Sequence, residues 1–170
     1  MGLVNVYFSL GSNLGDREAN IAGALRRMDE AFGTRYISLS TMIETEPMGF
    51  SGGKFLNAVV LYRMARKSGQ PSEILRKVKE IEREMGRTDR PEYDEAGERI
   101  YHSRPIDIDI LFYGPEIIDI PDLVIPHKGI GDRPFVMIPL LEVARPSLKR
   151  AFPEYFRKND IDKLKTNLTI

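Results

Sequence analysis

The order of segments with strand and helix periodicity restricts the fold of this chain more than any other feature. Apolar, β-rich runs that predict strands alternate with stripes of apolar residues that predict amphipathic helices. Strands are expected at 4–10, 36–45, 55–62 and 106–113, and helices at 16–32 and 71–85. This β-α-β-β-α-β order predicts an α+β protein with a ferredoxin-like antiparallel sheet, on which helices pack to give three α/β/α layers.

Later segments extend this pattern. A helix is expected at 134–143 and a last short helix at 155–164, while 117–118 are expected in a short partner strand. A chain of 170 residues fits one domain, because a second domain would be unusually small. We therefore expect a single domain over 1–170.

The composition excludes several classes of site. The chain has no cysteine, which rules out a disulfide, a thiolate zinc site and a cysteine nucleophile. Lysine plus arginine equals aspartate plus glutamate, at 25 each, so no overall basic field attracts a nucleic-acid backbone. No apolar run approaches the ~20 residues that cross a bilayer, and residues 1–10 lack the features of a secretory signal. We therefore expect a cytoplasmic protein that binds neither nucleic acid nor membranes.

The segment 87–103 is polar and charged, and it carries almost no residues suited to a core. This composition predicts a long exposed loop, and long loops inside compact domains are usually functional or mobile. The segment carries Arg87, Arg90 and Arg99 and leads directly to Arg104. We therefore expect a lid that becomes ordered over a bound polyphosphate.

The strongest chemical signal is the pair Asp107 and Asp109, in the strand expected at 106–113. Side chains two residues apart on a strand point to the same face, while the isoleucines beside them point into a core. Two carboxylates this close repel each other unless a cation lies between them, and paired oxygen ligands favour magnesium. The alternative is a solvated strand face with two acids, but Arg104 and the charged segment before it favour a magnesium site.

The segment 11–15, Gly-Ser-Asn-Leu-Gly, follows a strand and precedes a helix, as phosphate-binding loops do. It lacks the lysine of the P-loop and does not match the Gly-x-Gly-x-x-Gly motif of dinucleotide-binding proteins. We therefore expect a structural turn, with Asp16 near the start of the next helix.

His127 lies in a predicted loop and is followed by Arg133 and Phe135. A lone histidine is more often structural or exposed than a ligand. An arginine near an aromatic ring can nevertheless hold a phosphate beside a flat ring system. The residue types alone leave both interpretations open, and they assign no role to His102.

Taken together, these motifs resemble the family of 6-hydroxymethyl-7,8-dihydropterin pyrophosphokinases of folate biosynthesis. The resemblance covers about 4–144 and rests on several motifs in the same order. They are Gly11-Ser12-Asn13-Leu14, Thr45-Glu46-Pro47-Met48-Gly49, Phe55-Leu56-Asn57-Ala58, Arg104-x-x-Asp107-x-Asp109-Ile110-Leu111, Pro126-His127 and Arg133-x-Phe135. The combination is highly specific, although each motif alone is weak.

The resemblance implies a diphosphotransferase that moves diphosphate from ATP, its co-substrate, to the hydroxymethyl group of 6-hydroxymethyl-7,8-dihydropterin and releases AMP. It implies two magnesium ions bound by Asp107 and Asp109. It also implies that ATP and the pterin are the only partners and that the protein is a monomer.

The resemblance also implies roles for individual residues. The pterin-binding residues are Thr45, Met48, Phe55, Asn57 and Phe135, and the ATP-binding residues are Glu82, Arg104, His127 and Arg133. The catalytic residues are Arg87, Arg104, Asp107 and Asp109. Either Arg90 or Arg99 is expected to contact the triphosphate, and Tyr101 stands where the family often has tryptophan.

Two other classes share parts of this pattern. Nucleotidyltransferases also combine a Gly-Ser turn with an Asp-x-Asp motif, but their motifs are close together, whereas over ninety residues separate them here. An RNA-binding module on a ferredoxin-like sheet needs exposed aromatic residues on the central strands and a basic face. The balanced charge and the acidic pair argue against such a module.

Overall fold

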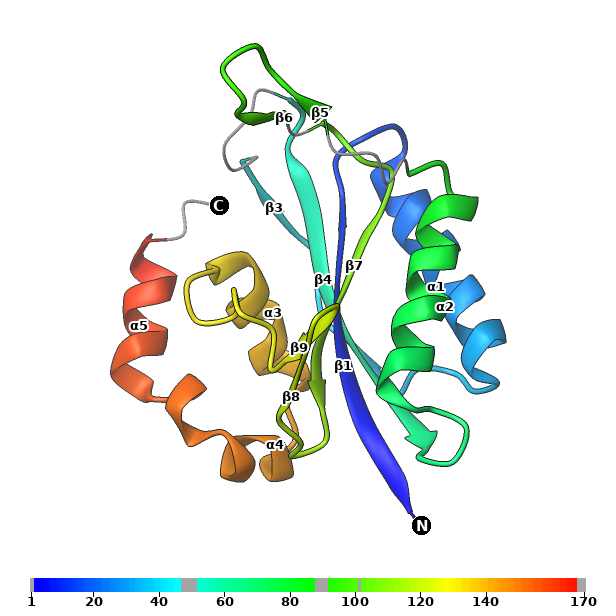
Figure 1. Cartoon of the computed structure of the whole chain (residues 1–170). Coiled ribbons are helices and arrows are strands. Elements are labelled where there is room, and N and C mark those ends of the chain that lie inside the picture. The colour runs from blue at the N-terminus through cyan, green and yellow to red at the C-terminus, as the bar shows by residue number, and fades with distance from the viewer. Residues whose placement is uncertain (1, 47–51, 88–91, 101, 168–170) are drawn as a thin grey trace.

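The computed structural model of the chain describes residues 2–46, 52–87, 92–100 and 102–167. Its centre is a five-stranded antiparallel sheet (Figure 1). The longest strand is β4 (Phe55–Ala65), which pairs with β1 (Leu3–Ser12). On its other side β1 pairs with β7 (Asp107–Tyr113).

Two short strands complete the sheet. β2 (Ser38–Leu39) and β3 (Ile43–Thr45) both pair with β4, on the side away from β1. The sheet therefore has the order β2-β4-β1-β7, with β3 alongside β4. The predicted strand at 36–45 is thus divided into two pieces, β2 and β3. Between them Ser40 still bonds Val59, because its backbone N donates to Val59 O and its Oγ accepts from Val59 N, each at 2.9 Å.

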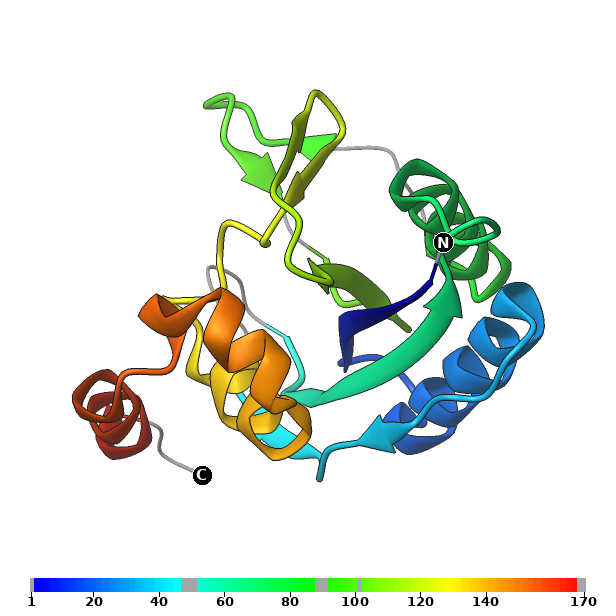
Figure 2. The ribbon, with the colours of Figure 1, turned by 90° about the horizontal axis from the view of Figure 1, so that it is seen from below.

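Helices cover both faces of the sheet. One face carries α1 (Arg17–Phe32) and α2 (Pro71–Glu84), and the other side carries α3 (Pro134–Val143), α4 (Pro146–Ala151) and α5 (Lys158–Asn167) (Figures 1 and 2). A short 3₁₀ turn, Pro153–Tyr155, joins α4 to α5. The expected mixture of helices and antiparallel sheet is therefore present, with one helix more near the end than predicted.

The two helical layers create two hydrophobic cores, and the alternation of side chains along each strand supplies both. On β1, Tyr7 joins the core under α3, whereas its neighbour Phe8 joins the core under α1 and α2. Successive strand residues point to opposite faces, so a strand covered on both sides is apolar at nearly every position. Burial of both faces fixes the register of the strands that carry the candidate site.

Local signals define the helix ends that the sequence predicts. The Asp16 side chain accepts a 3.1 Å hydrogen bond from Ala19 N and caps α1, which ends at Gly33 with φ 66°. A left-handed φ at this position favours glycine, because it has no Cβ to clash. Pro71 occupies the first turn of α2, where its missing N–H has no intrahelical partner to lose.

The segment 87–103 is not a loop throughout. Its described part contains a hairpin of β5 (Glu92–Tyr93) and β6 (Arg99–Ile100), closed by Asp94, whose carboxylate accepts from Ala96 N and Glu98 N at 2.9 Å. All residues of this hairpin are exposed, as predicted. The pairing escaped prediction because the alternation that reveals a strand comes from burial of one face, and neither face is buried here.

A strand forms near the expected 117–118, but its pairing partner differs from the one predicted. β8 (Ile118–Ile120) pairs with β9 (Leu123–Ile125) in a separate hairpin and not with β7. Within the described ranges, no helix is both long and apolar enough to cross a membrane.

Candidate active site

Asp107 and Asp109 begin the edge strand β7. They lie opposite Gly11 and Ser9 of β1, while Ile108 between them is 4% exposed and packs in the core under α1 and α2. Both carboxylates remain partly exposed, with 28% and 33% of the side-chain surface accessible. The two acids therefore share the face opposite Ile108, as the strand spacing predicts.

The environments of the two carboxylates differ. Asp107 is paired with Arg87, at 2.7 Å between Asp107 Oδ1 and Arg87 Nη1, and with Arg104, at 3.3 Å between Asp107 Oδ2 and Arg104 Nη1. Burial raises the pKa of Asp109 above its usual range, and the negative charge of Asp107 raises it further. A cation next to Asp109 would reverse this effect, because it would favour the charged carboxylate.

Glu82 connects α2 to this strand. It is 5% exposed, accepts a 3.0 Å hydrogen bond from Ile108 N and forms an ion pair with Arg87. Burial raises the pKa of Glu82 to about 7, while the positive charge of Arg87 acts in the opposite direction. Arg87 thus lies between Glu82 and Asp107, which fixes the start of the charged segment against the acidic pair.

A first cavity of about 450 Å³ opens on the side of the carboxylates that faces β3 and α3. Its lining includes four residues that the sequence assigns to the pterin, namely Thr45, Phe55, Asn57 and Phe135. Gly11 forms part of the same wall, where an added Cβ would lie 3.4 Å from Asn57 Oδ1 and 3.5 Å from the Phe55 ring. The cavity therefore combines two aromatic rings with one buried amide.

The Asn57 amide is held in place from β3. Its Nδ2 donates to Thr45 Oγ1 at 2.8 Å and to Ile43 O at 3.4 Å, and the residue is 6% exposed. A buried amide with fixed partners can present its remaining polar edge to a ligand in one orientation. Thr45 thus acts on this cavity through Asn57 as well as through its own surface.

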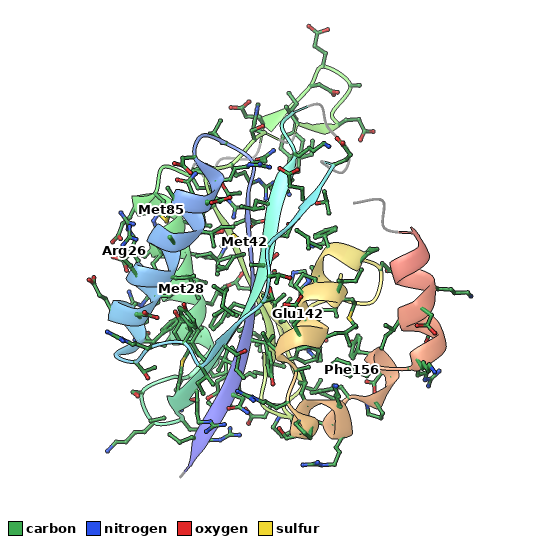
Figure 3. All side chains as sticks on the ribbon, turned by 180° about the vertical axis from the view of Figure 1, so that it is seen from behind. Arg26, Met28, Met42, Met85, Glu142 and Phe156 are labelled. Carbon is green, nitrogen blue, oxygen red and sulfur yellow. The ribbon has the colours of Figure 1, made fainter. Side chains whose placement is uncertain are left out.

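A second contact joins the two walls of this cavity. Glu142 on α3, which Figure 3 labels, accepts from Thr41 N at 2.6 Å and from Thr41 Oγ1 at 2.5 Å. Thr41 lies two residues before β3, which carries Thr45, and α3 carries Phe135. These two hydrogen bonds therefore connect α3, which carries Phe135, to the segment that leads into β3, which carries Thr45 and so orients Asn57.

A second cavity of about 400 Å³ lies on the other side of the carboxylates. Its lining includes Glu82, Arg87 and His127, and also Lys79 and Lys128. The residues 121–124, in and before β9, form an opposite wall. Asp107 and Asp109 line both cavities, so the acidic pair lies at the boundary between an aromatic cavity and a cavity with several cations.

His127 faces this boundary. Its Nδ1 accepts a 3.1 Å hydrogen bond from Gly129 N, and its Nε2 lies 3.8 Å from Asp109 Oδ1. Burial lowers the pKa of His127, and the nearby Arg133 lowers it further. A lowered pKa favours the neutral ring, and the bond that Nδ1 accepts favours the tautomer with its proton on Nε2.

Comparison with known proteins gives the decisive observation. The model of the family described as 7,8-dihydro-6-hydroxymethylpterin-pyrophosphokinase matches residues 7–145. The chain belongs to this family. All residues that form the two cavities lie within the matched range.

The similar proteins include single-function and larger members of the pterin pyrophosphokinase family. A 2-amino-4-hydroxy-6-hydroxymethyldihydropteridine pyrophosphokinase from Porphyromonas gingivalis is 45% identical over 142 residues, which cover 82% of this chain and 90% of that protein. The enzyme of the same name from Aquifex aeolicus is 35% identical over 164 residues, or 94% of both chains. A folate synthesis bifunctional protein from Arabidopsis thaliana is 42% identical over 139 residues, 81% of this chain but 26% of that protein.

A similar solved structure is described as a crystal structure of HPPK-DHPS in complex with substrates. It has a TM-score of 0.61 and 14% sequence identity, and the match covers 98% of this chain and 45% of that chain. At this identity the similarity concerns the fold alone.

The two carboxylates at the boundary between the cavities are oxygen ligands of the kind that a hard divalent cation prefers. Within the described part of the chain, no three histidine, aspartate or glutamate side chains gather into a complete metal site. Magnesium commonly takes only one or two protein carboxylates and completes its shell with water and substrate phosphates. Asp107 and Asp109 supply the two carboxylates that such a magnesium site needs from the protein.

Two predicted ATP-binding residues lie on the aromatic side. Arg104 and Arg133 line the first cavity with both aspartates, and the Arg133 guanidinium carbon lies 5.9 Å from the centre of the Phe135 ring. Three other predicted residues, Met48, Arg90 and Tyr101, lie outside the described residues. Arg99 lies on β6 in the exposed hairpin.

Asn13 is expected in a structural turn, but its side chain also connects three segments of the site. Its Oδ1 accepts from Arg104 N at 2.6 Å, and its Nδ2 donates to Gly53 O and Ser103 Oγ, each at 3.2 Å. The residue is 6% exposed. Its membership of the motif Gly11-Ser12-Asn13-Leu14 was the available signal, and that motif does not reveal partners that are 40 to 91 residues away.

Proposed function

We propose that this protein transfers diphosphate from ATP to the hydroxymethyl group of 6-hydroxymethyl-7,8-dihydropterin and releases AMP, as a step of folate biosynthesis. Family membership and the names of the similar proteins support the acceptor and the transferred group. The observation that carries the proposal is that Asp107 and Asp109 line both cavities. A ligand in each cavity would therefore bring its reacting end to the same two carboxylates.

In this proposal the pterin occupies the first cavity. Its flat ring lies between Phe55 and Phe135, and Asn57 hydrogen-bonds its edge. The volume and the aromatic lining support a small planar ligand. Thr45 orients the amide, and Met48 contributes through its backbone.

ATP occupies the second cavity in this proposal. Arg87 and His127 line it, and Lys79 and Lys128 add positive charge near the phosphates. Arg104 and Arg133, on the other side of the aspartates, contact the phosphate group that passes to the acceptor. Glu82 contributes by holding Arg87 and the start of β7.

Asp107 and Asp109 would hold two magnesium ions in this proposal. These ions would neutralise negative charge on the phosphates. The hydroxymethyl oxygen attacks the β-phosphorus, the bond from this phosphorus to the α–β bridging oxygen breaks, and AMP leaves. The hydroxyl proton passes to solvent, and no residue acts as a dedicated base. The protein acts by orientation and charge stabilisation, because phosphoryl-type transfers need little covalent assistance.

The proposal also covers the type of fold, the number of domains, the cellular location and the oligomeric state. The strand order, with β1 and β4 adjacent at the centre, supports the ferredoxin-like description of the sheet. We propose one domain over 1–170, acting as a cytoplasmic monomer.

The test is the identity of the nucleotide product. With ATP, magnesium and the hydroxymethyl dihydropterin, chromatography should detect AMP and a pterin diphosphate in equal amounts. Omission of the pterin should abolish AMP release. Accumulation of ADP with a monophosphorylated pterin would contradict the proposed reaction.

A further inference from the structure

A third cavity, of about 390 Å³, lies at the end of the sheet away from the carboxylates. The start of β1, the end of β4, Gly114 after β7, and α4 form its walls. The two cavities share no lining residue, although Tyr7 in this cavity and Ser9 in the first cavity are two residues apart on β1, or ~7 Å at ~3.3 Å per residue. This cavity, called the far pocket below, is therefore separate from the proposed reaction site.

The far pocket has an excess of positive charge. Arg63, Arg66 and Arg150 line it, and its described lining contains no aspartate or glutamate. Arg63 Nε donates to the neutral Asn5 Oδ1 at 3.1 Å, and Arg66 pairs with Glu116 at 3.2 Å. One carboxylate therefore lies next to a group of three guanidinium ions.

The surroundings orient Arg66 before any ligand binds. Its guanidinium carbon lies 5.6 Å from the centre of the Tyr113 ring, a distance typical of cation–π contacts. Gly114 has φ 50°, a left-handed conformation that favours glycine. A Cβ there would also lie 3.3 Å from Arg66 Nη2 and 3.1 Å from the Val4 side chain.

The floor of the far pocket is buried. Tyr7 is 1% exposed, and its hydroxyl accepts a 3.0 Å hydrogen bond from Arg145 N. Arg63 and Arg150 in the walls are exposed and Arg66 is half-buried, so water screens the charge of Arg66 less than the other two charges. Part of the wall, Ser147, Leu148 and Arg150, belongs to α4, which lies beyond the residues 7–145 that match the family.

We propose that the far pocket binds a small anion that carries phosphate groups. A guanidinium presents its donors in a fixed fork that matches the oxygens of a phosphate, and three guanidinium ions could share a di- or triphosphate. The cavity has the size of a small-molecule site. This inference does not depend on the proposed reaction, because the two sites share no lining residue.

The test uses isothermal titration calorimetry of the whole chain with inorganic phosphate, inorganic pyrophosphate and ADP. Titrations are made in EDTA at constant ionic strength, in the Arg104→Gln/Arg133→Gln background, which weakens anion binding at the reaction site. We expect at least one anion to bind, and Arg63→Gln/Arg150→Gln to weaken it by about ten-fold or more. The three anions distinguish free phosphate from phosphate attached to a nucleoside.

A charge-matched control uses Arg26 and Arg76, which are exposed on α1 and α2 (Figure 3 labels Arg26). Arg26→Gln/Arg76→Gln should leave anion binding unchanged. In an otherwise unaltered chain, Arg63→Gln/Arg150→Gln should also leave AMP release unchanged. If that variant does not fold, Ser147→Glu replaces it, since an acidic residue suits the first turn of α4 and should abolish binding.

Two outcomes would overturn the proposal. The first is that none of the three anions binds. The second is that binding occurs but does not fall further in the far-pocket variant than in the control, because such a result reports net charge or binding elsewhere.

Discussion

Replacement of Thr45 by valine tests how the first cavity orients Asn57. Valine keeps the shape of threonine but removes Oγ1, which accepts the 2.8 Å hydrogen bond from Asn57 Nδ2. Asn57 is 6% exposed, so water cannot readily replace the lost acceptor. A net hydrogen bond contributes ~0.5–1.5 kcal/mol, and a buried donor without a partner costs ~1–3 kcal/mol. We therefore expect Thr45→Val to lower the free energy of unfolding by about 1–2 kcal/mol.

The same change should weaken pterin binding, because Asn57 is no longer held for its ligand. We expect the KM for the pterin to rise roughly 5- to 30-fold, the factor that corresponds to such energies. The KM for ATP should stay unchanged, since Thr45 and Asn57 do not line the second cavity. Initial rates of AMP release, with each substrate varied in turn, measure both constants, and urea denaturation measures stability.

The matched control is Thr34→Val. Its hydroxyl donates only a long, 3.5 Å bond to Arg35 O, in an exposed turn after α1. This variant should keep both KM values and most of its stability. If Thr45→Val lowers stability but leaves the pterin KM unaltered, or raises both KM values equally, then Thr45 has no specific role in orienting Asn57.

Three further predictions concern other parts of the site. Asp107→Asn and Asp109→Asn should each lower turnover by about 10³-fold or more with unchanged circular dichroism, because less metal charge reaches the phosphates; near-normal turnover in a folded variant would exclude a metal role. Phe55→Ala should weaken pterin binding far more than ATP binding in equilibrium dialysis, since stacking adds ~0.5–1.5 kcal/mol to the lost burial; equal losses would indicate a core role. Replacement of the hairpin 92–100 by a Gly-Ser linker should leave the melting temperature and ATP affinity unchanged but lower turnover about ten-fold, as for a lid; full turnover would argue against a lid.

Sequence predicted those elements whose signals are local. Asp16 and Gly33 mark the ends of α1 in any context that allows a helix, because a cap acts within a few residues. The alternation of isoleucine and aspartate in 106–110 likewise fixes which face of the strand carries the acids. Neither prediction needs knowledge of a distant partner.

Features that depend on distant partners were not predicted from the residues. The bond between Asn57 and Thr45 follows from the register of β3 against β4, and the bond between Glu142 and Thr41 joins residues 101 positions apart. The side of the aspartates on which Arg133 lies depends on the path of the chain after β9. Patterns of period two or 3.6 contain no information about such contacts.

The Asn13 amide has a consequence for the tolerance of this position to replacement. It accepts a bond through oxygen and donates two through nitrogen, in a site that is 6% exposed. Aspartate has the same length but cannot donate, leucine can do neither, and glutamine is one methylene longer. Threonine has a similar size but donates only one bond, and no other natural side chain of this size accepts one bond and donates two from separate atoms. Random substitution at position 13 should therefore return asparagine alone among active variants. Selection at this position then acts on one amide group. This amide holds together the segment before Phe55 and the segment before the two aspartates.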